Sequence, residues 1–211
     1  MNIIELKKVT KCYGKKMILN KFNLSVRNGE IIAIRGVSGK GKSTLLNIIG
    51  LIEDFDDGEL IIHGVSGLTP TNKKTPKMIR EKIGYLFQNF ALIDSATVEY
   101  NLNIAMKYIK ISSEQKHKKV IKALDDVGLQ GYEKKKVYEL SGGEQQRVSI
   151  ARIMVKPCDI ILADEPTGSL DEENKNKILG LLKSLNEQGK TIVIVTHDES
   201  VTHICTRVKV I

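Results

Sequence analysis

A glycine-rich segment that ends in a lysine and a serine is the first candidate for chemistry. It follows the apolar segment 31–34 directly, and its sequence is Gly36-Val37-Ser38-Gly39-Lys40-Gly41-Lys42-Ser43. Glycines in such a turn leave backbone N–H groups free to surround a polyphosphate, and the N-terminus of a following helix adds positive potential. Lys42 can reach the β and γ phosphates, and the hydroxyl of Ser43 can bind Mg²⁺. We therefore predict that residues 36–43, continued by Thr44, form a phosphate-binding loop.

Two acidic residues follow another apolar segment, residues 160–163. Asp164 comes at the predicted carboxyl end of this strand, which is the edge where ligands bind in α/β sheets. We expect Asp164 to hold Mg²⁺, largely through water. Glu165 is expected to point the other way along the strand edge, free to act as a base on an attacking water. Acidic residues at strand ends are also common in turns. The phosphate-binding loop earlier in the chain is therefore what favours a functional role for this pair.

A third motif combines a serine with two glycines and has the sequence Leu140-Ser141-Gly142-Gly143-Glu144-Gln145-Gln146-Arg147. Ser141 and Glu144 match a capping box, which is a purely structural alternative. That alternative does not explain two glycines in the first turn of a helix, where each is less favourable than alanine by about 1 kcal/mol. An anion that approaches the bare backbone would explain them. The chain would then have two phosphate-binding helix ends, which cannot easily serve the same nucleotide.

The elements around these motifs alternate between strands and helices. In the first third, an alternating segment at 22–26 leads through Asn28-Gly29 into the buried segment 31–34, which predicts a β-hairpin. A single helix is expected there, from near Gly41 to about Gly50. This part of the chain is otherwise rich in predicted strands.

Residues from about 90 to 155 are predicted to be mainly helical. Ser112 and Gln115 match a capping box, and Ser141 is expected to begin a further helix. In the last third, the β-branched segment 191–196 and the earlier segment 160–163 flank a helix. Apolar strands in a strand-helix-strand order predict a parallel sheet that is covered on both faces.

Composition limits the class of protein. The chain has 211 residues, of which 41% are hydrophobic, which fits one large domain with a substantial core. No membrane span or secretory leader is predicted. Three scattered cysteines without a C-x-x-C pair argue against a disulfide framework and favour a reducing cytosol. A net charge of +8 suggests nucleic acid, anionic lipid or a polyanionic ligand, with a lysine-rich solvated surface as the alternative.

Taken together, the motifs resemble those of an ABC-type ATPase domain. The resemblance rests on the phosphate-binding loop, on LSGGEQQR at 140–147, on ILADEP at 161–166 and on Thr196-His197. It implies an α/β P-loop NTPase fold with a mostly parallel core sheet, an N-terminal antiparallel β subdomain and an α-helical subdomain inserted at about 90–155, all within a single domain, 1–211. It also implies ATP, Mg²⁺ and a head-to-tail homodimer, in which the LSGG segment of one copy closes over the nucleotide of the other.

The resemblance assigns further roles to single residues. Tyr13 resembles the aromatic residue that stacks on adenine, with packing at a strand end as the alternative, and Gln88 resembles a glutamine that contacts Mg²⁺ and the attacking water. His197 resembles a histidine that contacts the γ-phosphate. The segment Ser169-Leu170-Asp171 resembles a loop that links the two nucleotide sites, with Asp171 as the N-cap of the next helix as the alternative. The implied catalytic residues are Glu165, His197, Lys42 and Gln88; the implied Mg²⁺ ligands are Ser43, Gln88 and Asp164; and the implied nucleotide contacts are Tyr13, Gly36, Val37, Ser38, Gly39, Lys40, Gly41, Lys42, Ser43, Thr44, Ser141, Gly142, Gly143, Glu144, Gln145 and Asp171.

Two longer segments resemble one group of ABC ATPases. Residues 80–102 and 161–174 are similar to the ATPases of lipoprotein release, macrolide export and antimicrobial-peptide export or resistance, and the short, lysine-rich chain is similar to bacteriocin exporters. This implies a separate integral membrane permease and location at the cytoplasmic face of a bacterial membrane. It also implies a docking groove, to which Phe87, Phe90, Leu92 and Ile93 are candidates to contribute, with ordinary core packing as the alternative for each of them.

ABC ATPases that act on DNA or on the ribosome are the alternative. Only residues 44–139 separate the loop from the LSGG motif, and they contain no sustained heptads for the long coiled coil of chromosome-structuring relatives. Ribosome-acting members carry two such domains in one chain. We therefore expect no nucleic-acid partner, and we attribute the positive charge to a surface near an anionic membrane.

Overall fold

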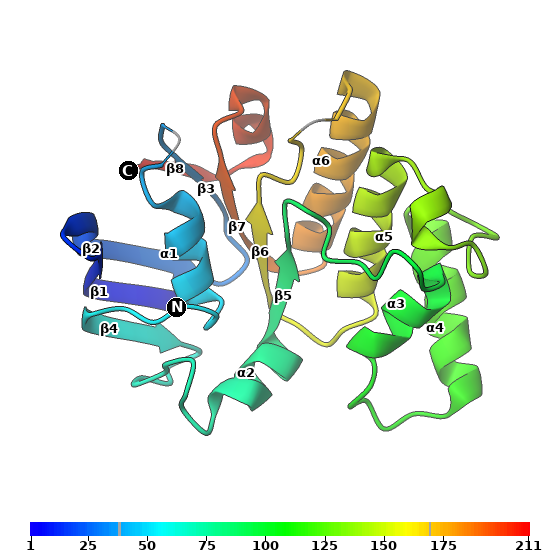
Figure 1. The fold of residues 1–211 in the computed structure, drawn as a ribbon, viewed down its shortest axis with the longest axis horizontal. Coiled ribbons are helices and arrows are strands. Elements are labelled where there is room, and N and C mark those ends of the chain that lie inside the picture. The colour runs from blue at the N-terminus through cyan, green and yellow to red at the C-terminus, as the bar shows by residue number, and fades with distance from the viewer. Residues whose placement is uncertain (38, 169) are drawn as a thin grey trace.

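Two sheets organise the protein, for which the computed structural model describes residues 1–37, 39–168 and 170–211 (Figure 1). The smaller sheet is antiparallel, with the strand order β2-β1-β4, and consists of β1 (Asn2–Tyr13), β2 (Lys16–Arg27) and β4 (Asp57–Ile62). The larger sheet is parallel, with the order β5-β6-β7-β3-β8, and consists of β3 (Ile31–Arg35), β5 (Ile83–Leu86), β6 (Ile160–Asp164), β7 (Thr191–Thr196) and β8 (Arg207–Val210).

The helices begin largely where their capping residues predict. They are α1 (Lys42–Ile49), α2 (Thr75–Lys82), α3 (Val98–Ala105), α4 (Ser113–Asp126), α5 (Gly142–Met154) and α6 (Glu172–Glu187), with 3₁₀ turns at Val137–Glu139 and Glu199–Ile204. Ser112 with Gln115 and Ser141 with Glu144 both form complete capping boxes, so the predicted starts of α4 and α5 are confirmed. In Figure 1, α3, α4 and α5 lie at the opposite end of the molecule from the antiparallel sheet.

The predicted β-hairpin at Asn28-Gly29 is wrong. β2 pairs with β1, and Tyr13 faces Lys16 at the turn that joins them. The Asn28-Gly29 turn instead carries the chain from one sheet to the other, because β3 pairs with β7 and β8. Residues 31–34 are all buried, as expected of a strand inside a parallel sheet, and an alternating, half-buried strand is not its natural partner.

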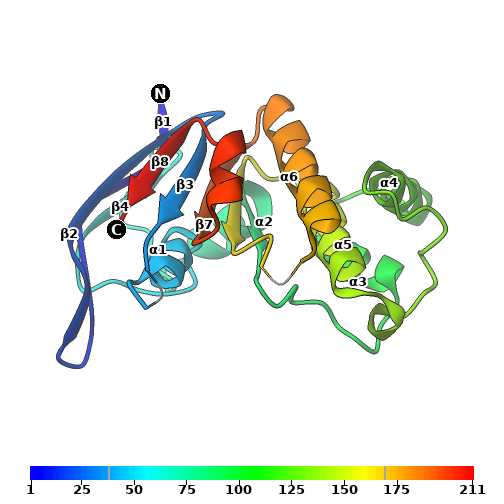
Figure 2. The ribbon, with the colours of Figure 1, turned by 90° about the horizontal axis from the view of Figure 1, so that it is seen from above.

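Both faces of the parallel sheet are covered, as predicted. Alternate residues of β3 enter different cores: Ile31 packs in a core with apolar residues of α5 and α6, whereas Ile32 and Ile34 pack in a core with α1 and the antiparallel sheet. Figure 2 shows the central strands between these two groups of elements. The sheet is therefore packed on both faces, and the loops at the carboxyl ends of its strands start from this buried base. Among the described residues, no helix combines the length and apolar character needed to cross a bilayer.

Candidate functional site

A cleft of about 480 Å³ lies where the segments that follow β3, β5, β6 and β7 converge. Its size falls in the range of small-molecule sites. The carboxyl edge of a parallel sheet is also the edge where α/β proteins bind ligands. The lining residues come from segments far apart in the sequence and are Tyr13, Lys16, Ile18, Gly39, Gly41, Lys42, Ser43, Thr44, Gln88, Glu165 and His197.

The glycine-rich loop turns tightly into α1. Gly41 is the N-cap residue of that helix, with a φ of 87°, and a Cβ at this position would lie 2.4 Å from Cγ2 of Ile18. Among the described residues, no side chain caps α1, so the N–H groups of its first turn face the cleft without such a partner. The ammonium of Lys42 donates to the carbonyls of Gly36 and Val37, at 2.8 and 3.3 Å. The lysine side chain thus folds back over the loop, where its ammonium could contact a bound phosphate group.

Ser43 and Asp164 meet at one side of the cleft. The Ser43 hydroxyl donates to Oδ1 of Asp164 at 3.1 Å. Burial raises the pKa of Asp164, and the neighbouring Glu165 charge adds to this effect, while the Ser43 hydrogen bond and Lys42 oppose it. A desolvated carboxylate beside a hydroxyl provides the hard oxygen ligands that Mg²⁺ prefers.

A cation at this position would have to share its coordination with the nucleotide. Within the described parts of the chain, no three His, Cys, Asp or Glu side chains cluster as metal ligands. Mg²⁺ commonly binds through one or two carboxylates together with substrate phosphates and water. The donor set of Ser43, Asp164 and the nearby amide of Gln88 fits that pattern.

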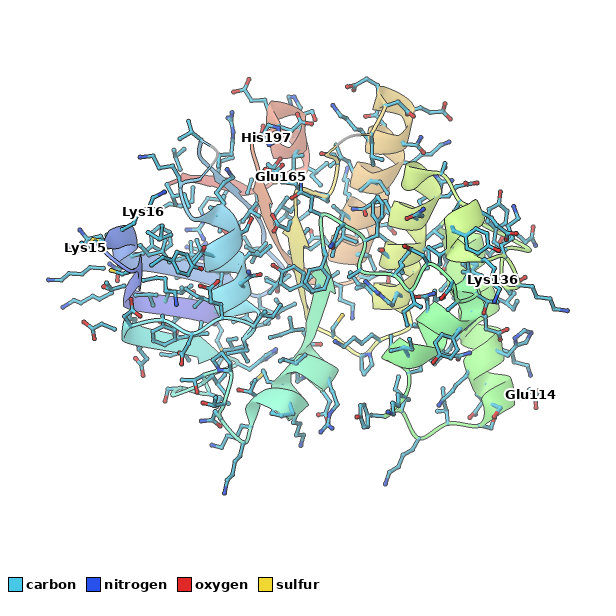
Figure 3. All side chains as sticks on the ribbon, viewed as in Figure 1. Lys15, Lys16, Glu114, Lys136, Glu165 and His197 are labelled. Atoms are coloured by element: carbon cyan, nitrogen blue, oxygen red, sulfur yellow. The ribbon has the colours of Figure 1, made fainter. Side chains whose placement is uncertain are left out.

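Glu165 differs from the prediction in one respect. Its backbone is left-handed, with a φ of 45°, and this turns the side chain toward the end of β7. The carboxylate accepts hydrogen bonds from the Thr196 hydroxyl at 3.0 Å and from the backbone N–H of His197 at 3.4 Å, and it lies 2.8 Å from Nδ1 of His197. The carboxylate is therefore held in place rather than free, although it still lines the cleft (Figure 3).

Tyr13 stands at the mouth of the cleft. Its hydroxyl donates to the carboxylate of Glu53 and lies 3.4 Å from the hydroxyl of Thr44. The ammonium of Lys11 lies 5.2 Å from the centre of the ring, and it also pairs with Glu53. Tyr13 as a residue is 49% exposed, which is compatible with stacking of a base on its ring.

The LSGG segment lies apart from this cleft. Ser141 caps α5, and none of the five predicted residues at 141–145 lines the cleft. The side chains of Glu144 and Gln145 are engaged within the helical part: Glu144 accepts from the Tyr132 hydroxyl at 3.0 Å, and Gln145 donates to the Leu140 carbonyl at 3.0 Å. Only Ser141 and Gly142 are exposed there.

The two glycines of this motif have different surroundings. A Cβ on Gly142 would meet only the ring of Phe90, at 3.9 Å, whereas a Cβ on Gly143 would lie 2.6 Å from Cγ of Asn174. Asn174 is itself fixed, because Arg147 donates to it at 2.8 Å. Packing against Asn174 of α6 therefore gives a second reason for the glycine at position 143, and the contact of both glycines with an anion stays a prediction.

Asp171 is the N-cap residue of α6. Its carboxylate accepts from the backbone and the side-chain amide of Asn174, both at 2.8 Å. These hydrogen bonds lower the pKa of Asp171. The capping alternative is thus present in the structure, and Asp171 does not line the cleft. Of the other predicted positions, Ser38 and Ser169 lie outside the described residues.

A larger groove, of about 560 Å³, lies between the parallel sheet and the helical end. Of the four residues predicted for a docking groove, Phe87 lines it, beside Ala91, Tyr108 and Arg152. Leu92 instead packs against the hydrophobic core, Ile93 is exposed outside the groove, and Phe90 approaches α5.

Comparison with known proteins decides the family. The family model described as "ABC transporter" matches residues 19–168, which include the glycine-rich loop, the LSGG segment and Asp164. The chain belongs to the ABC transporter family. The predicted enzyme class, an ATPase that uses ATP and Mg²⁺, follows from this membership.

Related ABC proteins differ from the chain in length. It is 38% identical over 210 residues to the macrolide export ATP-binding/permease protein MacB of Pasteurella multocida, and 39% identical over 210 residues to MacB of Escherichia coli. The match covers 98% of this chain but 32% of each relative, so the chain spans about a third of the length of these proteins.

Solved ABC structures share the fold. The dimeric structure of MJ0796, a bacterial ABC transporter cassette, is 40% identical, with a TM-score of 0.90 over 99% of this chain and 94% of that chain. CbiO1 of Clostridium perfringens, part of the transporter complex CbiONQ, is 30% identical with a TM-score of 0.86, over 99% of this chain and 84% of that chain. These similarities confirm the predicted fold class, an α/β ABC ATPase with a parallel core sheet.

Sequence reasoning missed Lys16 and Ile18, although both line the cleft of this ABC ATPase. Lys16 faces Tyr13 across the turn between β1 and β2. The prediction missed this contact because it paired the strand at 22–26 with the strand at 31–34 instead of with β1. A turn at Gly14-Lys15 would have placed Lys16 beside the predicted adenine contact.

The packing of the signature glycines predicts opposite effects on stability. Gly143→Ala should lower the free energy of unfolding by about 1–2 kcal/mol, because the new methyl group overlaps Asn174. Gly142→Ala should raise it by up to about 1 kcal/mol, because the site is open and alanine favours helix. Thermal unfolding checks this, since each kcal/mol shifts Tm by about 2–4 °C in a chain of this size. Equal effects of the two substitutions would contradict the packing account.

Proposed function

We propose that this ABC ATPase works as a head-to-tail homodimer that hydrolyses ATP between two copies and drives a separate integral membrane permease. The supporting observation is the separation within one chain of the nucleotide cleft and the exposed N-terminus of α5 at Ser141 and Gly142. A second copy can bring that helix end over the nucleotide, where its N–H groups and dipole would meet the γ-phosphate. The relative MJ0796 has a dimeric structure, which supports the pairing of two copies.

The nucleotide would lie along the cleft with its base on Tyr13 and its phosphates in the loop 36–41. Lys42 would neutralise the β and γ phosphates, with Thr44 beside them. Ser43, Asp164 and Gln88 would hold Mg²⁺, which when bound offsets the negative charge of the phosphate oxygens. Each of these side chains lines the cleft or bonds a residue that does.

Hydrolysis would then proceed by attack of water on the γ-phosphorus. Glu165 would accept a proton from the water, a P–O bond to the water oxygen would form, and the bond from phosphorus to the β–γ bridging oxygen would break, releasing ADP and phosphate. Thr196 fixes the Glu165 carboxylate through its hydroxyl. His197 would contact the γ-phosphate while its Nδ1 stays beside Glu165.

Mixing two inactive variants tests the head-to-tail arrangement. Lys42→Ala removes the phosphate contact of a subunit, and Gly142→Asp places a negative charge where the α5 terminus would meet the partner's nucleotide. Each variant alone should hydrolyse ATP at under about 1% of the wild-type rate. A mixed dimer contains one site with an intact loop and an intact signature, so mixing should restore activity.

The fraction restored identifies the arrangement. Random pairing of equal amounts makes about half of the dimers mixed, each with one intact site, so recovery of at most about a quarter of wild-type activity is expected. Gly142 is the right position because an added side chain has space there, whereas Gly143 has none. A mixture that stays as inactive as its components, although both variants are folded, would contradict the shared site.

The transported compound and the membrane partner belong to the same proposal. Resemblance to MacB over a third of its length supports export of, or resistance to, peptide, antimicrobial or lipid-like substrates at the cytoplasmic face of a bacterial membrane. The groove beside Phe87 and Tyr108 would receive a segment of the permease. Co-purification with the membrane subunit, followed by ATPase assays with candidate peptides, tests this; salt-sensitive DNA binding would instead favour an ABC ATPase that acts on nucleic acid.

A further inference from the structure

Two consecutive residues after Gln88 have a strained backbone. Phe90 and Ala91 have φ values of 62° and 48°, and in the described ranges they are the only adjacent non-glycine residues with positive φ. L-residues rarely adopt this left-handed conformation, because Cβ then crowds the carbonyl oxygen. Such a turn persists only where neighbouring groups hold it, and strain of this kind is concentrated at functional sites.

Two side chains of α5 hold this turn. The guanidinium of Arg152 donates to the carbonyls of both positive-φ residues: Nη2 donates to the Phe90 carbonyl at 2.8 Å, and Nη1 donates to the Ala91 carbonyl. The hydroxyl of Ser149, which is fully buried, donates to the Phe90 carbonyl at 3.0 Å. Because the guanidinium is a rigid planar fork, it fixes the relative orientation of two adjacent carbonyls in a way that an ammonium cannot.

Residues in and beside this turn lie next to the signature end of α5, the large groove and the nucleotide cleft. The ring of Phe90 lies 3.9 Å from the position of a Cβ on Gly142, at the signature end of α5. Ala91 and Arg152 line the large groove, together with Phe87. Gln88, two residues before the turn, lines the nucleotide cleft. Residues 87–91 therefore lie along α5, near Gly142 at its start and bonded to Arg152 near its end, between the groove and the nucleotide cleft.

We propose that Arg152 is a positioning residue for Gln88: by holding the left-handed turn at Phe90 and Ala91, it fixes Gln88 in the nucleotide cleft. The inference rests on the proposed function, in which Gln88 contacts Mg²⁺ and the attacking water. Arg152 itself does not line the nucleotide cleft, so its removal should impair the chemical step and leave nucleotide binding intact.

The first experiment separates turnover from binding. Arg152→Lys should lower kcat for ATP about tenfold, while the Kd for ATP stays within about twofold of the wild-type value. If Arg152 acts through Gln88, the double variant Arg152→Lys/Gln88→Ala should be no slower than Gln88→Ala alone, because the two effects share one route. Ser149→Ala, which removes a single hydrogen bond to the turn, should lower kcat about threefold and carries the test if Arg152→Lys does not fold.

The second experiment relieves the strain itself. Glycine adopts positive φ readily, so Ala91→Gly should make the turn less dependent on Arg152 and restore at least about half of the kcat lost in Arg152→Lys. Ala105 lines the same groove but lies within α3, so Ala105→Gly is the matched control and should restore nothing. A purely structural role of Arg152 would not be rescued by a glycine at one backbone position.

The outcomes distinguish the inference from the function on which it rests. An unchanged kcat in the folded Arg152→Lys variant, multiplicative losses in the double variant, or equal rescue by both glycines would each overturn the inference while leaving the proposed function intact. Wild-type hydrolysis by Gln88→Ala would instead remove the role assigned to Gln88, and the inference would fail with it.

Discussion

Glu165→Gln should lower kcat for ATP hydrolysis about a thousandfold, since a general base contributes roughly 10²–10⁴ to the rate. The substitution keeps the size of the side chain and a carbonyl oxygen that can still accept a hydrogen bond from Thr196. The left-handed backbone at residue 165 should therefore be retained. The substitution removes the group that takes the proton from water. ATP affinity should stay the same or rise, because the lost charge is negative and lies beside a triphosphate.

Single-turnover hydrolysis and ATP titration measure the two quantities separately, and gel filtration with ATP should show accumulated dimers. Glu199→Gln is the matched control: Glu199 lies just beyond His197, its side chain is 80% exposed and it pairs with Arg35, so its loss should leave kcat unchanged. Hydrolysis at the full rate by Glu165→Gln would exclude Glu165 as the base.

Lys42→Ala should weaken ATP binding about a hundredfold. Charge-assisted hydrogen bonds contribute roughly 1.5–3 kcal/mol, and 1.4 kcal/mol corresponds to a factor of ten. In the structure the Lys42 side chain is buried against the carbonyls of Gly36 and Val37, so the ammonium is already positioned within the loop. To bind phosphate, the ammonium would only have to exchange these carbonyl oxygens for phosphate oxygens.

A fluorescent ATP analogue measures this change directly. Lys40→Ala provides the control, because Lys40 lies on the same loop and carries the same charge, but its side chain is exposed and its expected contribution is its backbone N–H. That variant should bind ATP within about twofold of the wild-type protein. Equal losses in both variants would indicate a general charge effect and contradict the specific role of Lys42.

The sequence predicts well those features that depend on adjacent residues. The capping boxes at Ser112 and Ser141 lie where expected, because both partners of each box are three residues apart. The buried strand at 191–196 is recovered for a similar reason, since its β-branched residues all favour the same conformation. The convergence of Lys42, Ser43, Glu165 and His197 on one cleft follows from the rule that parallel strands present their carboxyl ends at a single edge.

Features that depend on distant partners are not predictable in the same way. The Asn28-Gly29 turn has hairpin residues, but the buried character of 31–34 selects β7 and β8 as partners from more than 150 residues away. Gly143 is required by Asn174, which no local pattern indicates. The left-handed backbone of Glu165, which turns its carboxylate to His197, also arises from contacts beyond the local sequence.

The strand order of the parallel sheet has a consequence for synthesis of the chain. β3 precedes the phosphate-binding loop, but the partners that the described strands give it are β7 and β8, which come more than 150 residues later. At roughly 5–20 residues per second on a ribosome, about 10–30 s separate the emergence of residue 35 from that of residue 196, where β7 ends. During that interval the apolar strand Ile31–Arg35 has no sheet partner, so it should be the segment that chaperones bind most strongly and that aggregates first when synthesis stalls.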